Sequence, residues 1–104
     1  MDIRKLLAKT STVNFVLYDE EVEVVYKVGA YTASKRIEFF ENEEMTLYDI
    51  AEWLVDEAVV SWSLTDGDEP FDVTVENLNL LPTQFHGALM RAIQNDTGVV
   101  DEGE

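Results

Sequence analysis

The segment TVNFVLYDEEVEVVYKV, residues 12–28, alternates apolar and polar side chains on both sides of the acidic pair Asp19-Glu20. Alternation with period two, rich in β-branched and aromatic residues, is typical of half-buried strands. The segment therefore predicts an antiparallel β-hairpin. Because it lacks the Asn-Gly or Asp-Gly pair that a tight turn prefers, we expect a connection of three to five residues around residues 19–21.

Residues 32–43 fit two structures. As a helix, the segment is capped by Thr32 and places Ile37 and Phe40 on one side; as a third strand, it alternates Ile37 and Phe39 with charged residues. Good helix formers dominate and few residues are β-branched, so the composition favours the helix.

Residues 47–60 predict a clearer helix. Thr46 stands at the N-cap position and Asp49 lies three residues later, where its charge suits the first turn. Apolar residues follow at steps of three and four: Leu47, Ile50, Ala51, Leu54, Ala58 and Trp62. This helix is the expected cover for the apolar face of the hairpin.

The segment TDGDEP, residues 65–70, has the strongest turn chemistry of the chain, with Gly67 free to adopt positive φ. Thr74 is placed to cap a short helical turn reaching Leu80, and Pro82 to begin the last helix, which we expect to end at Gly98. The apolar face of this last helix comprises Phe85, Leu89, Ala92 and Ile93.

The order of these elements predicts an α+β fold, with an N-terminal β-hairpin packed against three or four helices. The chain of 104 residues suits a single small domain. We assign residues 1–11 to a basic N-terminal arm, residues 12–97 to the domain and residues 98–104 to an acidic flexible tail.

The composition excludes several classes of protein. Without cysteine, the chain can have no disulfide scaffold, thiol nucleophile or thiolate metal site. Its net charge is −15, divided as +1 over residues 1–36 and −16 over residues 37–104, which disfavours direct contact with a nucleic-acid backbone. No apolar run approaches the length of a membrane span, so we expect a cytoplasmic protein.

Candidate chemical groups are sparse. The carboxylates of Asp66, Asp68, Asp72 and Glu76 do not have the spacing of a calcium-binding loop. His86 is the only histidine, and with no nucleophile motif near it we expect a partly exposed helix residue. The sequence also lacks a glycine-rich phosphate loop and a nucleophile elbow. We therefore expect no catalytic residue, cofactor or metal ion.

Large apolar side chains suggest instead a protein that binds a partner. Trp62 and Phe85 lie on predicted core faces, whereas Trp53 and Met90 lie off the main apolar stripes. Exposed groups of this size often mark interaction sites. Trp53 and Met90 are thus the candidate partner-binding residues.

Four segments resemble the small tail assembly chaperones of long-tailed bacteriophages. They are YKVGAYT (26–32), VSWSLTDGDEPFDVT (60–74), LNLLP (78–82) and LMRAI (89–93), and the resemblance covers about residues 20–96. It implies a non-enzymatic protein of the infected bacterium's cytoplasm that keeps the tape measure protein soluble while tail tube subunits assemble around it.

In such a protein the motif residues have structural roles around the acidic turn. Here these are Trp62, Leu64, Asp66, Gly67, Pro70, Thr74, Leu81 and Pro82. Two features depart from the resemblance: Asp68-Glu69 lengthens the turn, and the basic residues between Arg4 and Lys9 have no counterpart.

Two other functions fit the sequence. One is a structural tail or connector subunit of the virion, which needs a self-complementary interface. The other is an acidic DNA mimic that inhibits a host DNA-binding protein, which needs carboxylates along one continuous face. The sequence leaves homo-oligomerisation and the tail tube protein as a second partner open.

Overall fold

The computed structural model describes residues 2–97, which form an α+β fold with an N-terminal hairpin, as the sequence predicts. The elements in chain order are α1 (Ile3–Leu7), β1 (Thr10–Leu17), β2 (Glu20–Lys27), the 3-10 helix η1 (Val28–Ala30), α2 (Ala33–Glu41), α3 (Leu47–Glu57), β3 (Val59–Trp62), β4 (Thr65–Asp66), β5 (Glu69–Pro70), α4 (Val75–Leu78) and α5 (Thr83–Thr97). No helix in this range is long and apolar enough to cross a membrane. The expected helix end at Gly98 and the acidic tail lie outside the described residues.

The connection between β1 and β2 is shorter than the sequence predicts. Leu17 pairs directly with Glu20, so only Tyr18 and Asp19 form the turn, and both have positive φ, 51° and 67°. Two left-handed residues are what a type I′ turn requires, and its twist matches that of the flanking strands. The expectation of a three- to five-residue loop was wrong because a tyrosine and an aspartate fill positions that usually hold Asn-Gly.

A third strand replaces the end of the predicted second helix. α3 ends at Glu57 instead of Val60, and residues 59–62 form β3, which pairs antiparallel with β2. Trp62 therefore belongs to a strand and not to the helix stripe. β-branched Val59 and Val60 favour the extended conformation, and β2 offers unpaired backbone groups to them. The sheet order is β1-β2-β3.

Local capping determines where the helices begin. Thr46 and Asp49 form the predicted capping box of α3, with hydrogen bonds of 3.2 and 3.0 Å. α2 is confirmed as a helix capped by Thr32. However, α2 turns Phe39 into the core, whereas Ile37 and Phe40, the expected inner residues, are exposed.

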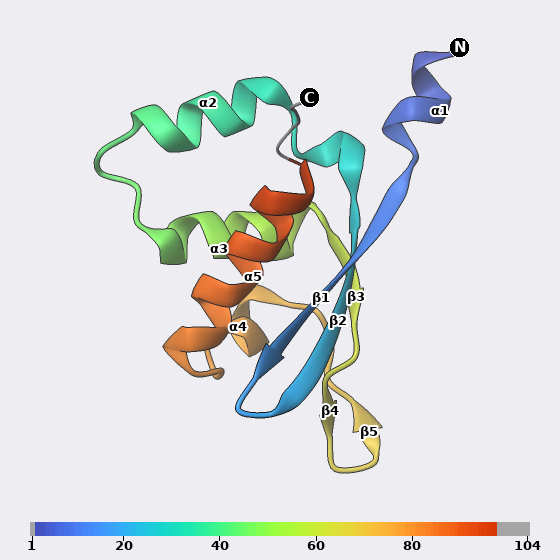
Figure 1. Ribbon diagram of the computed structural model, residues 1–104, viewed down its shortest axis with the longest axis vertical. Helices are drawn as coiled ribbons and strands as arrows, with labels where there is room; N and C mark the ends of the chain where they lie inside the picture. The colour runs from blue at the N-terminus through green and yellow to red at the C-terminus, as the bar shows by residue number, and fades with distance from the viewer. Residues whose placement is uncertain (1, 98–104) are drawn as a thin grey trace.

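Helices α2 to α5 lie on one side of the three-stranded sheet (Figure 1). α5 packs along β1 and against α3, so α5 and not α3 is the main cover of the hairpin. The centre of the core is fully buried and comprises Tyr26, Val24, Leu54, Leu78, Leu89 and Ile93.

The N-terminal arm contains α1, which buries no residue and packs against η1, and β1 already begins inside the predicted arm at Thr10. The contact with η1 depends on Gly29, because a Cβ at this position would overlap the Leu7 carbonyl oxygen and lie 2.6 Å from Leu7 Cα.

Gly29→Ala is expected to displace α1 while leaving the domain folded. Amide exchange should accelerate at Ala8, Lys9 and Val28, whose N–H groups donate to backbone carbonyls at 2.9–3.3 Å. The free energy of unfolding should fall by less than about 1 kcal/mol, because α1 contributes nothing to the core. Gly87→Ala is the matched control, since its Cβ would meet only the Arg91 guanidinium at 3.6 Å. Unchanged exchange in Gly29→Ala would contradict the packing described for α1.

Candidate partner-binding groove

An apolar groove lies where the small β4-β5 hairpin meets the connection between α4 and α5. It has a volume of about 290 Å³ and is lined by Leu64, Thr65, Asp66, Phe71, Leu80 and Leu81. Leu80 is 73% exposed, the largest exposed fraction among the large apolar side chains of the described residues. A leucine held open beside other apolar residues can receive apolar side chains from a partner.

The hairpin side of the groove is fixed by the acidic turn. Gly67 has φ +67°, as expected for this turn, and β4 pairs with β5 around it. At the base of the hairpin the Phe71 N–H donates to the Leu64 carbonyl at 3.1 Å. The Trp62 indole N–H donates to the Phe71 carbonyl, and the two rings stack with centroids 6.2 Å apart. These contacts hold Phe71 in the groove wall.

The helical side is fixed by α4 and the turn that follows it. The Asn77 N–H donates to Thr74 Oγ1 at 3.0 Å, which confirms the predicted cap. The Leu80 and Leu81 N–H groups each donate to a carbonyl three residues earlier, at 3.1 Å. Leu78 is completely buried, so this contact and the two hydrogen bonds fix the position of the backbone that carries Leu80 outward.

The rim of the groove is acidic. Asp66 lines it, and Asp68 and Glu69 are exposed on the same hairpin. The two ion pairs within residues 2–97, Arg4–Asp2 and Lys35–Glu38, involve none of these carboxylates. The groove therefore combines apolar walls with negative charges available to a partner's Lys or Arg side chains.

A row of aromatic rings connects the groove to the β1-β2 hairpin through the core. Phe85 on α5 contacts Phe15 on β1 at 5.6 Å and Trp62 on β3 at 5.7 Å between centroids, both edge to face. Trp62 in turn stacks on Phe71. Phe85 is buried, as predicted, whereas Trp62 is half-buried and packs against the core.

The motif residues singled out in the sequence gather around this region. Leu64, Asp66 and Leu81 line the groove, and Trp62 and Pro70 line an adjoining depression that also includes Phe71. Gly67 forms the hairpin turn, Thr74 caps α4 and Pro82 directly precedes α5. Sequence reasoning missed Phe71 and Leu80. A signal existed in the LNLLP segment, which is more apolar than an exposed connection needs.

Trp53 and Met90, the predicted partner-binding residues, lie elsewhere. Both are half-buried and pack against the core. Trp53 contacts Phe39 edge to face at 5.2 Å, with Lys35 Nζ over its ring at 5.5 Å. Neither residue lines the groove.

His86 is buried, with 4% of its surface exposed, so the expectation of a partly exposed residue was wrong. Its Nδ1 lies 3.2 Å from the Pro82 carbonyl and its Nε2 3.4 Å from Asn79 Oδ1, while Tyr48 packs edge to face on the ring. These contacts join the start of α5 to α4 and α3. His86 therefore has a structural role.

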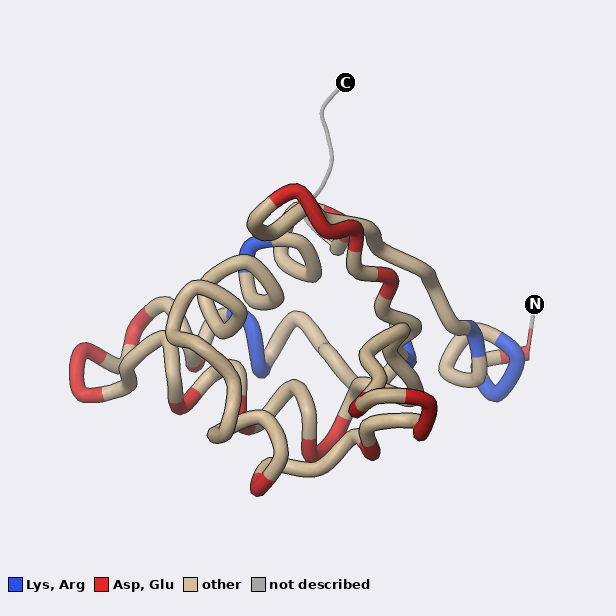
Figure 2. Tube along the Cα trace, turned by 90° about the horizontal axis from the view of Figure 1, so that it is seen from below, with Lys and Arg blue, Asp and Glu red and all other residues tan. Residues whose placement is uncertain are grey.

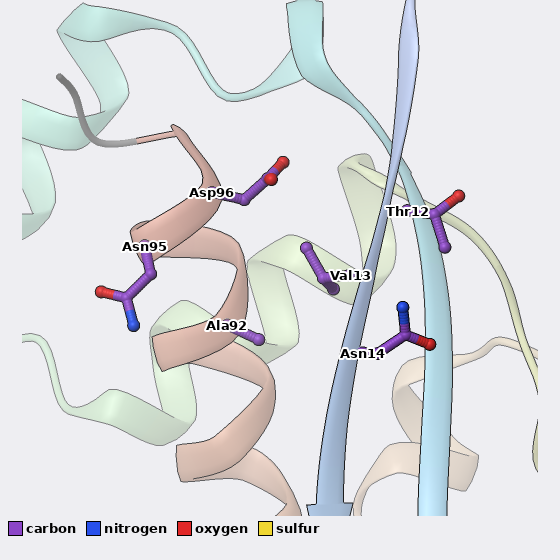
Figure 3. A pocket seen from close by; sticks show the side chains of 6 residues that line it. All are labelled: Thr12, Val13, Asn14, Ala92, Asn95 and Asp96. Atoms are coloured by element: carbon purple, nitrogen blue, oxygen red, sulfur yellow. The ribbon is translucent and has the colours of Figure 1, made fainter. Parts of the chain in front are cut away.

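A second, polar depression of about 450 Å³ lies between β1 and the end of α5 (Figure 3). Asp96 Oδ2 accepts hydrogen bonds from Ser11 Oγ at 2.7 Å and from the hydroxyl of buried Tyr26 at 2.5 Å. Burial of the phenol and its bond to this carboxylate raise the pKa of Tyr26 well above its ordinary value. Asp96 thus links α5 by hydrogen bonds to both β1 and β2.

Between residues 2 and 97 no group of three or more His, Asp or Glu side chains is arranged to hold a metal ion. No model of a protein family, no curated protein and no solved structure matches the chain.

Proposed function

We propose that this protein is a non-enzymatic tail assembly chaperone of a long-tailed bacteriophage, acting in the cytoplasm of the infected host. Its client is the tape measure protein, and the tail tube protein is a second candidate partner. The observation that carries the proposal is the groove lined by Leu64, Phe71, Leu80 and Leu81, because two of the four segments that resemble such chaperones, residues 60–74 and 78–82, supply its lining.

The chemistry of the groove suits the proposed client. A tape measure protein is a long chain of amphipathic helices, whose apolar faces associate with one another unless they are covered. A helix can place a row of apolar side chains into a shallow apolar groove. The net charge of −15 keeps a loaded complex dispersed by electrostatic repulsion.

Co-expression with the tape measure protein tests the proposal. The client should appear in the soluble fraction only when this protein is present. Leu80→Ser should weaken the complex by about ten- to a hundredfold, because a buried leucine contributes about 1.5–3 kcal/mol. Leu80 is exposed in the free protein, so its replacement should leave the fold intact.

Phe40→Ser is the matched control, since Phe40 is 63% exposed on α2 and does not line the groove. It should retain full solubilising activity. A client that stays insoluble with the wild-type protein would refute the chaperone function. Equal effects of the two variants would refute the assignment of the groove. Trp53→Ala and Met90→Ala test the two residues proposed from sequence alone.

The distribution of charge bears on the DNA-mimic alternative. In Figure 2 acidic residues occur on all sides of the trace in this view, while α1 carries basic residues. A mimic needs its carboxylates along one face at phosphate-like spacing. The observed distribution favours a charged surface that keeps the protein soluble.

A further inference from the structure

Strand β1 is an edge of the sheet, and the strand itself has none of the charges, prolines or bulges that usually protect an edge from pairing. Its eight residues, TSTVNFVL, include no charged side chain and no proline, and its pairing with β2 has no bulge. Soluble proteins normally place lysine, proline or a bulge on such an edge. The omission is notable in a chain in which 28% of residues are charged.

The other edge of the sheet is protected. β3 has only four residues, and its pairing with β2 shifts register between Val25 and Tyr26. A short, bulged edge is a poor template for a further strand. Strand addition is therefore specific to β1.

The backbone groups of alternate β1 residues point away from β2. Glu23, which faces Asn14, directs its N–H and carbonyl toward β3, where they bond Ser63 Oγ and the Ser63 N–H at 2.9 Å. In an antiparallel ladder the residue opposite then directs its own N–H and carbonyl outward. Asn14, and with it Thr12 and Val16, thus offers donors and acceptors at the open edge.

Two connected depressions lie along the β1 edge. The depression between Thr12 and Asp96 continues into one of about 310 Å³ lined by Asn14, Phe15, Val16 and residues of α5, and the two share Asn14, Ala92 and Asn95. Figure 3 shows Val13 on the side of α5 and Thr12 and Asn14 on the other side of the strand. No described segment pairs with β1 along this edge.

We propose that β1 pairs antiparallel with β1 of a second copy, which joins two three-stranded sheets into one. The charges at the two ends of β1 favour a second copy as the partner. The basic residues Arg4, Lys5 and Lys9 precede the strand, and the acidic residues Asp19, Glu20 and Glu21 follow it. Two antiparallel copies bring the basic end of each strand beside the acidic end of the other, with no charged side chain on either strand between them. This interface is independent of what the groove binds.

Sedimentation equilibrium of the full chain tests the interface. The measured mass should rise with concentration from 11.8 kDa toward twice that value. Asn14→Lys should raise the dimer dissociation constant at least about tenfold, because it brings two like charges close to the symmetry axis. Ser61→Lys makes the same change on exposed β3 and should leave the constant unchanged.

Charge reversal tests the orientation. Lys9→Glu and Glu20→Lys should each weaken the dimer, and the double variant should restore it, because the pairing then forms with its charges exchanged. A mass of 11.8 kDa at every concentration would overturn the proposal. So would a dimer that responds to Ser61→Lys and not to Asn14→Lys, or one that the double reversal fails to restore.

Discussion

Phe85→Ala is expected to lower the free energy of unfolding by about 3–5 kcal/mol, the typical cost of removing a buried phenylalanine. Phe85 is 3% exposed, and its ring joins Phe15 on β1 to Trp62 on β3. The loss is a large part of the roughly 5–15 kcal/mol that stabilises a typical domain. Urea denaturation followed by tryptophan fluorescence measures it.

The same replacement should also loosen the wall of the groove. Trp62 loses its contact with Phe85, and Trp62 is the residue on which Phe71 stacks. Phe40→Ala is the control. This ring is 63% exposed, so its removal should change stability by no more than about 0.5 kcal/mol. Similar costs for the two variants would show that α5 does not pack on the hairpin in the way described.

Asp96→Ala is expected to lower the free energy of unfolding by about 2 kcal/mol. It removes the acceptor of the Tyr26 and Ser11 hydroxyls and leaves the phenol of a fully buried tyrosine without its partner. Hydrogen bonds to a charged group contribute about 1.5–3 kcal/mol. A carboxylate in the last turn of a helix is unfavourable to the helix dipole, so the stabilisation comes from these bonds. Thermal or urea unfolding measures the change.

Asn95→Ala is the matched control, because Asn95 is an exposed neighbour on the same helix. It should cost less than about 0.5 kcal/mol. In a double-mutant cycle, Tyr26→Phe and Asp96→Ala should be strongly non-additive, since both remove the same hydrogen bond. Additive effects would contradict the coupling of α5 to the hairpin through Asp96.

The features that the sequence predicts well are local. Thr46 and Asp49 cap α3 through atoms three residues apart, and Thr74 caps α4 in the same manner. Gly67 adopts positive φ in a short turn. In each case the residues that determine the structure are near neighbours in the chain, so the pattern is visible without the fold.

The features that it misses depend on distant partners. β3 exists because Val59 to Trp62 meet the free side of β2, some 35 residues earlier in the chain. Phe39 is buried because Tyr31 and Trp53 lie beside it, although helical spacing alone points to Ile37 and Phe40. Periodicity cannot choose between such faces before the neighbours are known.

The sequence predicts only part of the groove, because its other residues meet through contacts between segments that are distant in the chain. The sequence indicates Leu64, Asp66 and Leu81 as structural residues, but they meet Phe71 and Leu80 only when the β4-β5 hairpin folds next to the end of α4. Trp53 and Met90 lie off the apolar stripes in the sequence, which suggests exposure, but both are half-buried against the core.

Site-specific crosslinking tests the central claim most directly, and the absence of native cysteine makes it clean. Leu80→Cys, labelled with a short photoreactive group, should crosslink to the co-expressed tape measure protein at one or a few apolar helical segments. Phe40→Cys, labelled in the same way, should not. Efficient crosslinking from position 40 with none from position 80 would contradict the binding of a helical client in the groove.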